Sequence, residues 1–202
     1  PRNHSSPRPR RQASRSSEIA SDLQSLSALG PVLPEIVLAL AAMVLLLVGV
    51  VFKRVPSALL SGVAIVVLAL VGIYVAVAGG GGDVLFNGGF INDSFARFMK
   101  VLVLAGSAFA LLLPLASARE NGIAKFEYAV LVMLATVGMM MMVSANDLMT
   151  LYVGLELQSL AAYVLASFMR RDQRSAEAGL KYFVLGALAS GILLYGISLV
   201  YG

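Results

Sequence analysis

Six long apolar runs constrain this sequence more than any other feature. A helix that rises about 1.5 Å per residue needs about twenty residues to cross the hydrocarbon core of a bilayer. Backbone groups in lipid must be hydrogen-bonded within the span, so each run is predicted to be a membrane-spanning α-helix. The predicted spans are residues 33–52, 57–78, 95–117, 126–145, 148–169 and 176–201. The sequence therefore predicts an all-α membrane protein with six transmembrane helices.

The composition excludes several functional classes. Apolar residues make up 59% of the chain and charged residues 13%, a balance far from that of a soluble domain. The net charge of +4 comes from the tail, because beyond Glu18 ten basic residues balance ten acidic ones. No basic face is left to neutralise phosphates, so we expect no nucleic-acid partner. With no Cys and His4 alone, the chain is expected to ligate no iron–sulfur cluster, zinc ion or haem, and we expect no cofactor in it.

The first thirty residues differ from the rest in composition. Residues 1–30 are polar and rich in Arg and Ser, and we predict that they are disordered. Residues 1–17 are rich in Arg and Ser and free of acidic residues, which is also typical of a transit peptide, but their prolines argue against an amphipathic targeting helix. The chain begins without Met and ends inside an apolar run, which indicates a fragment of a longer protein.

Charge in the loops predicts the orientation of the chain. Basic residues gather in alternate loops, which the positive-inside rule places in the cytoplasm. They are Lys53, Arg54, Arg119, Lys125, Arg170, Arg171 and Arg174. The amino terminus is then predicted to lie outside, although this puts the Arg-rich tail on the side that the rule disfavours.

The outer loop of residues 79–93 is rich in glycine. It lacks the Gly-Lys-Ser/Thr ending of a phosphate-binding loop. Residues 87–89 read Asn-Gly-Gly between apolar neighbours, a pattern typical of a tight turn between two short strands. We therefore predict a small hairpin at the outer face of the membrane.

Glu156 stands near the middle of the fifth predicted span, about 12 Å from its start. A charge in the membrane interior costs at least about 2.5 kcal/mol and commonly marks a pathway for ions or protons. Tyr152, Ser159, Tyr163 and Ser167 share its helix face. This polar stripe is expected to face protein or water instead of lipid.

Lys181 lies about 9 Å inside the sixth predicted span. It could reach back to the interface, or pair with Glu177 four residues earlier on its own helix. It could instead act with Glu156, because the fifth and sixth spans are antiparallel and joined by a short loop. Their backbones would be offset by roughly 9 Å, so water is expected to link them. Arg97 and Lys100, near one end of the third span, are expected to be interface anchors.

A carboxylate and an amine held in this way tune each other's affinity for protons. Burial raises the pKa of a carboxylic acid and lowers that of an ammonium group, whereas a neighbouring opposite charge does the reverse. A change in their separation can therefore load or release protons. We predict a proton-translocating site built on Glu156 and Lys181. The supporting residues are predicted to be Glu177, Tyr152, Ser159 and Tyr163.

Two stretches of these helices resemble the subunit N family of bacterial complex I, the proton-pumping NADH-quinone oxidoreductase. Residues 146–160 read NDLMTLYVGLELQSL, which is similar to the fifth-helix segment of that family. Residues 176–183, AEAGLKYF, and 186–196, GALASGILLYG, are similar to its next helix. Weaker similarity covers Leu33-Pro34-Glu35 at the start of the first span and residues 93–98 at the start of the third.

The resemblance implies an antiporter-like fold of fourteen membrane helices with two inverted five-helix repeats. Residues 31–118 would form three leading helices, and residues 119–202 the first three helices of a repeat. Glu156 and Lys181 would belong to the proton path of a translocase subunit in the bacterial inner membrane. NADH, FMN, iron–sulfur clusters and quinone would bind partner subunits, and contact of quinone with this chain is left open.

Two alternatives to that function stay open. One is a subunit of a multi-subunit cation/proton antiporter, and the other is a structural scaffold between membrane subunits. In every case, Gly186 and Ser190, four residues apart, predict tight packing of a neighbouring helix.

Overall fold

The structure is a computed structural model that describes residues 30–52, 56–78, 83–116, 126–169 and 172–202. In these ranges lie six helices that are long and apolar enough to cross a membrane. They are α2 (Leu33–Val51), α3 (Ser57–Val77), α4 (Ser94–Ala116), α5 (Phe126–Ser144), α6 (Leu148–Ala166) and α7 (Gln173–Tyr201). All six predicted spans are confirmed. The predicted disordered tail lies outside the described residues apart from Gly30, which begins the single turn η1 (Gly30–Val32).

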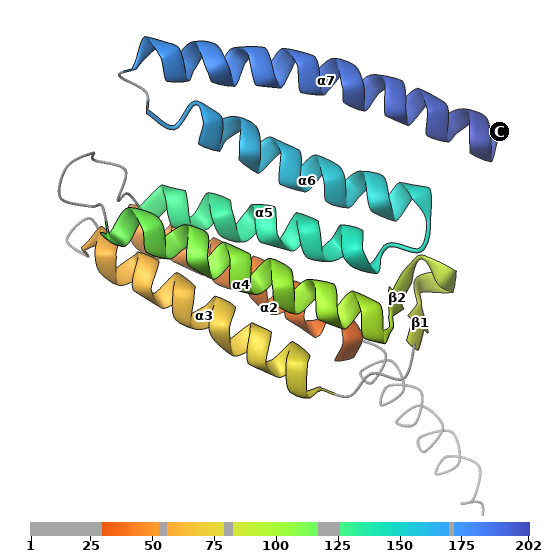
Figure 1. The fold of residues 1–202 in the computed structure, drawn as a ribbon, viewed down its shortest axis with the longest axis horizontal. Coiled ribbons are helices and arrows are strands. Elements are labelled where there is room, and N and C mark those ends of the chain that lie inside the picture. Colours follow the sequence, from red (N-terminus) through yellow and green to blue (C-terminus); the bar gives the residue numbers. More distant parts are fainter. Residues whose placement is uncertain (1–29, 53–55, 79–82, 117–125, 170–171) are drawn as a thin grey trace, which may run out of the picture. The chain divides into compact units, whose positions relative to one another are not determined.

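Within residues 34–202, successive helices run in opposite directions, and α6 and α7 follow in order beyond α5 (Figure 1). The contacts between helices follow the same order: α4 contacts α3 and α5, α5 contacts α6, and α6 contacts α7. The buried apolar core lies between α2, α3, α4 and α5. Its buried side chains include Leu38 of α2, Leu68 of α3, Leu104 of α4 and Met133 of α5. The two last helices are therefore layers added to one side of this core.

Large apolar side chains cover the outside of the helices. Leu40 of α2, Leu70 of α3, Phe109 of α4 and Leu188 of α7 are all exposed. A surface with so many exposed apolar side chains would associate in water, whereas lipid is a suitable solvent for it. The chain is therefore a multi-pass membrane protein, as predicted.

Two glycines bring the backbones of α5 and α6 together. A Cβ atom on Gly138 of α5 would lie 2.6 Å from the Gln158 nitrogen and 2.7 Å from the Gly154 oxygen of α6. A Cβ atom on Gly154 would lie 2.9 Å from the Gly138 oxygen. Side chains do not fit at these separations, so small residues permit the approach. The contact holds α6 against the core on either side of Glu156.

The loop between α3 and α4 forms the predicted hairpin. Its parts are β1 (Asp83–Leu85), the turn η2 (Phe86–Gly88) and β2 (Phe90–Asn92). The strands pair antiparallel with Leu85 opposite Phe90. Gly88 has a φ of 98°, a conformation that favours glycine. The hairpin lies beside the turn that joins α5 to α6, at the same end of the helices (Figure 1).

Candidate functional site

Glu156 accepts a hydrogen bond from α7 near the middle of α6. Its side chain is half-buried, and the Ser190 hydroxyl donates to its Oε1. The Tyr152 hydroxyl lies 2.9 Å from Ser190 Oγ. Because Ser190 has one hydroxyl proton and directs it to Glu156, Tyr152 is the donor in the second hydrogen bond. The three side chains form a continuous hydrogen-bonded chain between the two helices.

The polar stripe of α6 faces α7, which confirms the prediction that it would face protein or water. Tyr163 is buried, and its ring meets the rings of Tyr182 and Phe183 edge-on at centroid distances of 4.8 and 5.7 Å. Ser159 is half-buried on the same helix face as Tyr163. The stripe is therefore part of a helix–helix interface.

Small residues let α7 approach this stripe. A Cβ atom on Gly179 would lie 3.1 Å from the Ser167 Cα atom, and Gly186 lies directly against the Tyr163 ring. Ser190 follows Gly186 by about one helical turn and reaches Glu156 and Tyr152. The predicted tight packing at Gly186 and Ser190 is confirmed.

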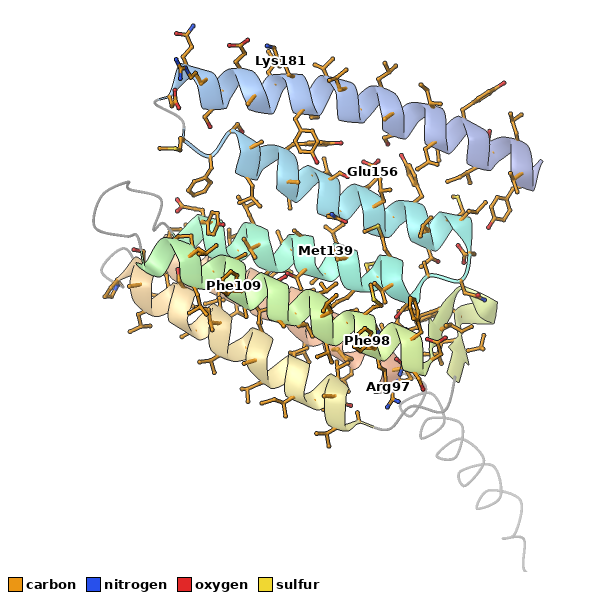
Figure 2. All side chains as sticks on the ribbon, viewed as in Figure 1. Arg97, Phe98, Phe109, Met139, Glu156 and Lys181 are labelled. Atoms are coloured by element: carbon orange, nitrogen blue, oxygen red, sulfur yellow. The ribbon has the colours of Figure 1, made fainter. Side chains whose placement is uncertain are left out.

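Lys181 does not contact Glu156. Its ammonium group lies 2.6 Å from Glu177 Oε1 in the same helix, and the two side chains are 70% and 58% exposed. Lys181 precedes Ser190 by nine residues, which is about 180° around a helix at about 100° per residue. Figure 2 accordingly shows Lys181 on the side of α7 away from α6. Lys181 could reach the interface, pair with Glu177 or act with Glu156, and the structure shows the pairing with Glu177.

A second pair of ionisable side chains is fully buried. Lys100 Nζ of α4 lies 2.7 Å from Glu35 Oε1 of α2, and the side chains are 1% and 5% exposed. The same Nζ lies 4.9 Å from the centre of the Phe90 ring in β2. The prediction that Lys100 is an interface anchor is wrong, because its charge is neutralised within the protein instead of reaching water. Arg97, the other expected anchor, donates from Nη1 to the Ala78 carbonyl oxygen at 2.9 Å.

The sequence contains a signal for this pair. Glu35 is the one charged residue in the first apolar run, and Lys100 interrupts the third run six residues after Ser94. The depth argument that singled out Lys181 applies equally to Lys100. Their pairing across two helices distant in the sequence has no local signal.

Asp147 caps the start of α6 outside the spans. Its Oδ1 accepts from the Thr150 nitrogen at 2.6 Å, and its Oδ2 accepts from the Thr150 hydroxyl at 3.0 Å. These hydrogen bonds, the backbone one first, hold the pKa of Asp147 below its usual value of 3.8. Across the described ranges, no three acidic, His or Cys side chains gather in a group that could hold a metal ion.

Comparison with known proteins agrees with the resemblance. A family model described as NADH:quinone oxidoreductase/Mrp antiporter, TM, matches residues 145–202. NADH-quinone oxidoreductase subunit N of Rhodospirillum rubrum is 52% identical over 181 residues, which is 86% of this chain. The same subunit of Paramagnetospirillum magneticum is 56% identical over 174 residues, or 85% of this chain. The segment of residues 145–202 belongs to the antiporter-like membrane subunit family.

Solved structures agree with the antiporter-like fold. Respiratory complex I from Thermus thermophilus with bound aureothin matches with a TM-score of 0.70 and 31% identity, over 84% of this chain and 36% of that chain. A membrane-bound sulfane sulfur reductase, an archaeal respiratory membrane complex, matches with a TM-score of 0.67 over 85% of this chain and 37% of its own. Its 23% identity shows likeness of fold alone. The predicted fold class is confirmed.

This chain spans about a third of the length of the curated relatives that it matches. It covers 36% of the Rhodospirillum rubrum relative and 35% of the Paramagnetospirillum magneticum relative. The segment matched by the family model, residues 145–202, includes α6 and α7 and therefore Glu156, Ser190 and Lys181. The Glu35–Lys100 ion pair lies before that segment.

Proposed function

We propose that this chain is part of a proton-translocating membrane subunit of an NADH-quinone oxidoreductase, in which Glu156 and Lys181 carry protons. The observation that carries the proposal is a hydrogen-bonded carboxylate, that of Glu156, in the middle of a membrane helix. Ionisable groups at such depth are costly, and they commonly belong to proton or ion pathways. The names of the chain's relatives support the same function.

The side chains of Tyr152, Ser190 and Glu156 can pass a proton between α6 and α7. Tyr152 donates to Ser190, and Ser190 donates to Glu156. A hydroxyl group can donate and accept at once. A proton that arrives at the Tyr152 oxygen can therefore release the Tyr152 proton to Ser190, and the Ser190 proton to the Glu156 carboxylate. Each hydroxyl is protonated again after this transfer, and Glu156 has gained one proton.

Lys181 would take part from the other side of α7. Its ammonium group lies 2.6 Å from Glu177 Oε1, and Glu177 would support the route by holding this group at the start of α7. A route from Lys181 to Glu156 has to pass around α7, because the two side chains lie on opposite sides of that helix. We propose that water completes this route. Ser159 and Tyr163 support it by lining the α6–α7 interface.

Electron transfer takes place elsewhere in this proposal. NADH, FMN, iron–sulfur clusters and quinone bind partner subunits, and this chain contributes proton movement to a translocase without redox chemistry of its own. Its partners are other membrane subunits and the lipid of a bacterial inner membrane. The loop charges support an amino terminus on the outside. Helices α2 to α4 would be the leading helices, and α5 to α7 the start of a repeat.

The alternative function is a subunit of a multi-subunit cation/proton antiporter. The description of the matching family model names Mrp antiporters beside NADH:quinone oxidoreductases, which favours this alternative over other transporters. A carboxylate in mid-membrane would serve either function. The greater than 50% identity to relatives named subunit N supports the oxidoreductase subunit more strongly.

The test is Glu156→Gln in the full-length protein within its isolated membrane complex. We expect the ratio of protons pumped to electrons transferred to fall while the complex still assembles. The control is Glu127→Gln, which neutralises another half-buried carboxylate in the first turn of α5, away from α7. An unchanged ratio would exclude Glu156 from the path. A loss of sodium or pH tolerance alone would favour the antiporter, and a loss of assembly alone would favour the scaffold.

A further inference from the structure

The buried Glu35–Lys100 ion pair is joined to the hairpin through Phe90. Lys100 Nζ lies 2.7 Å from Glu35 Oε1 and over the Phe90 ring, 4.9 Å from its centre. Phe90 itself is 5% exposed. Within the described residues, Lys100 is the only cationic side chain that contacts the Glu35 carboxylate, so Lys100 is its compensating charge. Glu35 thus holds a cation beneath an aromatic ring of β2.

The hairpin in turn holds the segment that leads into α6. The Asn146 backbone nitrogen donates to the Gly89 carbonyl oxygen at 3.0 Å, and its side-chain nitrogen donates to the Gly88 carbonyl oxygen at 2.6 Å. Phe90 also forms an antiparallel bridge with Ala145. The backbone bridge, to which the Asn146–Gly89 hydrogen bond belongs, and the Asn146 side chain therefore attach β2 and its turn to the two residues before the cap of α6.

The hairpin also rests directly on that cap. A Cβ atom on Gly89 would lie 2.6 Å from Asp147 Oδ2 and 3.4 Å from Thr150 Oγ1. Asp147 accepts from the Thr150 nitrogen and so fixes the first turn of α6. Glu156 follows on the same helix, about 13 Å beyond Asp147 at about 1.5 Å per residue. The position of the hairpin is therefore linked to the position of the helix that carries Glu156.

We propose that Glu35 is a positioning residue, which acts through Lys100 and Phe90 to hold the hairpin and the start of α6 in place. The physical reason is the fate of an unpaired cation. Without the Glu35 charge, the buried ammonium group of Lys100 would be uncompensated, and it would move towards water past Phe90. The aromatic ring and the strand that carries it would then leave their positions beside Ala145. The proposal concerns the placement of α6 and does not depend on proton movement.

The test is hydrogen–deuterium exchange of the full-length protein in its isolated membrane complex. In Glu35→Gln, we expect the amides of residues 83–92 and 145–152 to exchange at least about tenfold faster, with smaller changes elsewhere. The double variant Glu35→Gln with Lys100→Met has no cation to expel, so it is expected to restore slow exchange in both segments.

Thr136→Val is the matched control, because it removes a buried polar contact that does not involve Glu35, Lys100 or the hairpin. Thr136 of α5 and Ser107 of α4 have hydroxyl oxygens 2.7 Å apart in the core, and the variant removes that hydrogen bond without a change near the hairpin. It is expected to change the amide exchange rates of residues 83–92 and 145–152 no more than those of the rest of the protein. Equal loosening by Thr136→Val, or unchanged exchange of both segments in Glu35→Gln, would overturn the proposal. So would a double variant that exchanges as fast as Glu35→Gln. Exchange is measured without proton pumping, so failure here leaves the Glu156→Gln result standing, and the reverse also holds.

Discussion

The Ser190 hydroxyl of α7 donates a hydrogen bond to the Glu156 carboxylate of α6, near the middle of the membrane helix. This contact makes Ser190 the polar group through which α7 meets the carboxylate. Lys181, on the same helix, lies on the opposite side and pairs with Glu177. The two predicted proton carriers are therefore separated by the width of α7, and each has its own hydrogen-bonding partner.

Ser190→Ala is predicted to slow proton translocation without loss of assembly. The variant removes the donor to Glu156 and breaks the chain that begins at Tyr152. A hydrogen bond to a charged group is worth about 1.5–3 kcal/mol, so the rate is expected to fall about tenfold or more. The measurement is proton uptake by vesicles that contain the full-length complex.

Ser198→Ala is the control for that variant. Ser198 lies about two turns further along α7 and donates to the Tyr195 carbonyl oxygen of its own helix at 2.7 Å. Its loss is expected to leave the rate close to that of the wild type. If both variants pump equally well, the Ser190 hydroxyl has no part in the path.

Much of the interface around Glu156 could be predicted from the sequence. The spacing of Tyr152, Glu156 and Tyr163 indicates one helix face, and the stripe does face α7. Gly186 and Ser190 also pack against α6 as predicted. The same arithmetic sets Lys181 about 180° from Ser190, so a helix that presents its small residues to α6 has to point its lysine elsewhere.

The buried ion pair could not be predicted in the same way. Glu35 and Lys100 are separated by sixty-five residues, and helical periodicity places each on a face without naming its partner. The position of a charge near the end of a span predicts an interface anchor, because long side chains commonly reach the interface from there. The structure instead places α2, α4 and the hairpin together around the charge.

The buried and exposed ion pairs are predicted to differ in their effect on stability. Lys100→Met leaves the Glu35 carboxylate buried without its counter-charge, which is expected to lower the free energy of unfolding by about 3–5 kcal/mol. Lys181→Met removes one partner of an exposed pair within a helix, and a loss below about 1 kcal/mol is expected. Unfolding of the two full-length variants in the same detergent provides the comparison. Equal losses would mean that burial does not distinguish the pairs.

Asp147→Ala is predicted to loosen the start of α6 in a pH-dependent manner. Hydrogen bonds from Thr150 hold the pKa of Asp147 below 3.8 in the folded state, so its carboxylate stabilises the fold above that pH. The contribution is lost as the pH falls through the lowered folded-state pKa. Amide exchange of residues 148–152 is therefore expected to be faster in the variant at neutral pH, and the difference from the wild type should shrink below pH 3.8.

Asp172→Ala provides a matched control for that cap. Asp172 accepts from the Arg174 nitrogen at 3.0 Å and caps α7 in the same manner, at the other end of the helices from the hairpin. It is expected to speed exchange at the start of α7 and to leave the start of α6 unchanged. Faster exchange of residues 148–152 in this control would mean that the effect of Asp147 is not local.

Gly138→Ala is predicted to destabilise the protein and displace α6. The new Cβ atom would lie 2.6 Å from the Gln158 nitrogen and 2.7 Å from the Gly154 oxygen, and these backbone atoms of α6 can yield only if the helix moves. Overpacking of this kind costs about 1–3 kcal/mol. Gly62→Ala in α3 places the same methyl group where nothing lies within 4 Å, so it is expected to stabilise its helix by about 0.5–1 kcal/mol. Thermal unfolding of the two variants should therefore shift in opposite directions. Equal stability of the two variants would contradict the close crossing of α5 and α6. Because Gly154 and Gln158 flank Glu156, Gly138→Ala is also expected to impair proton uptake.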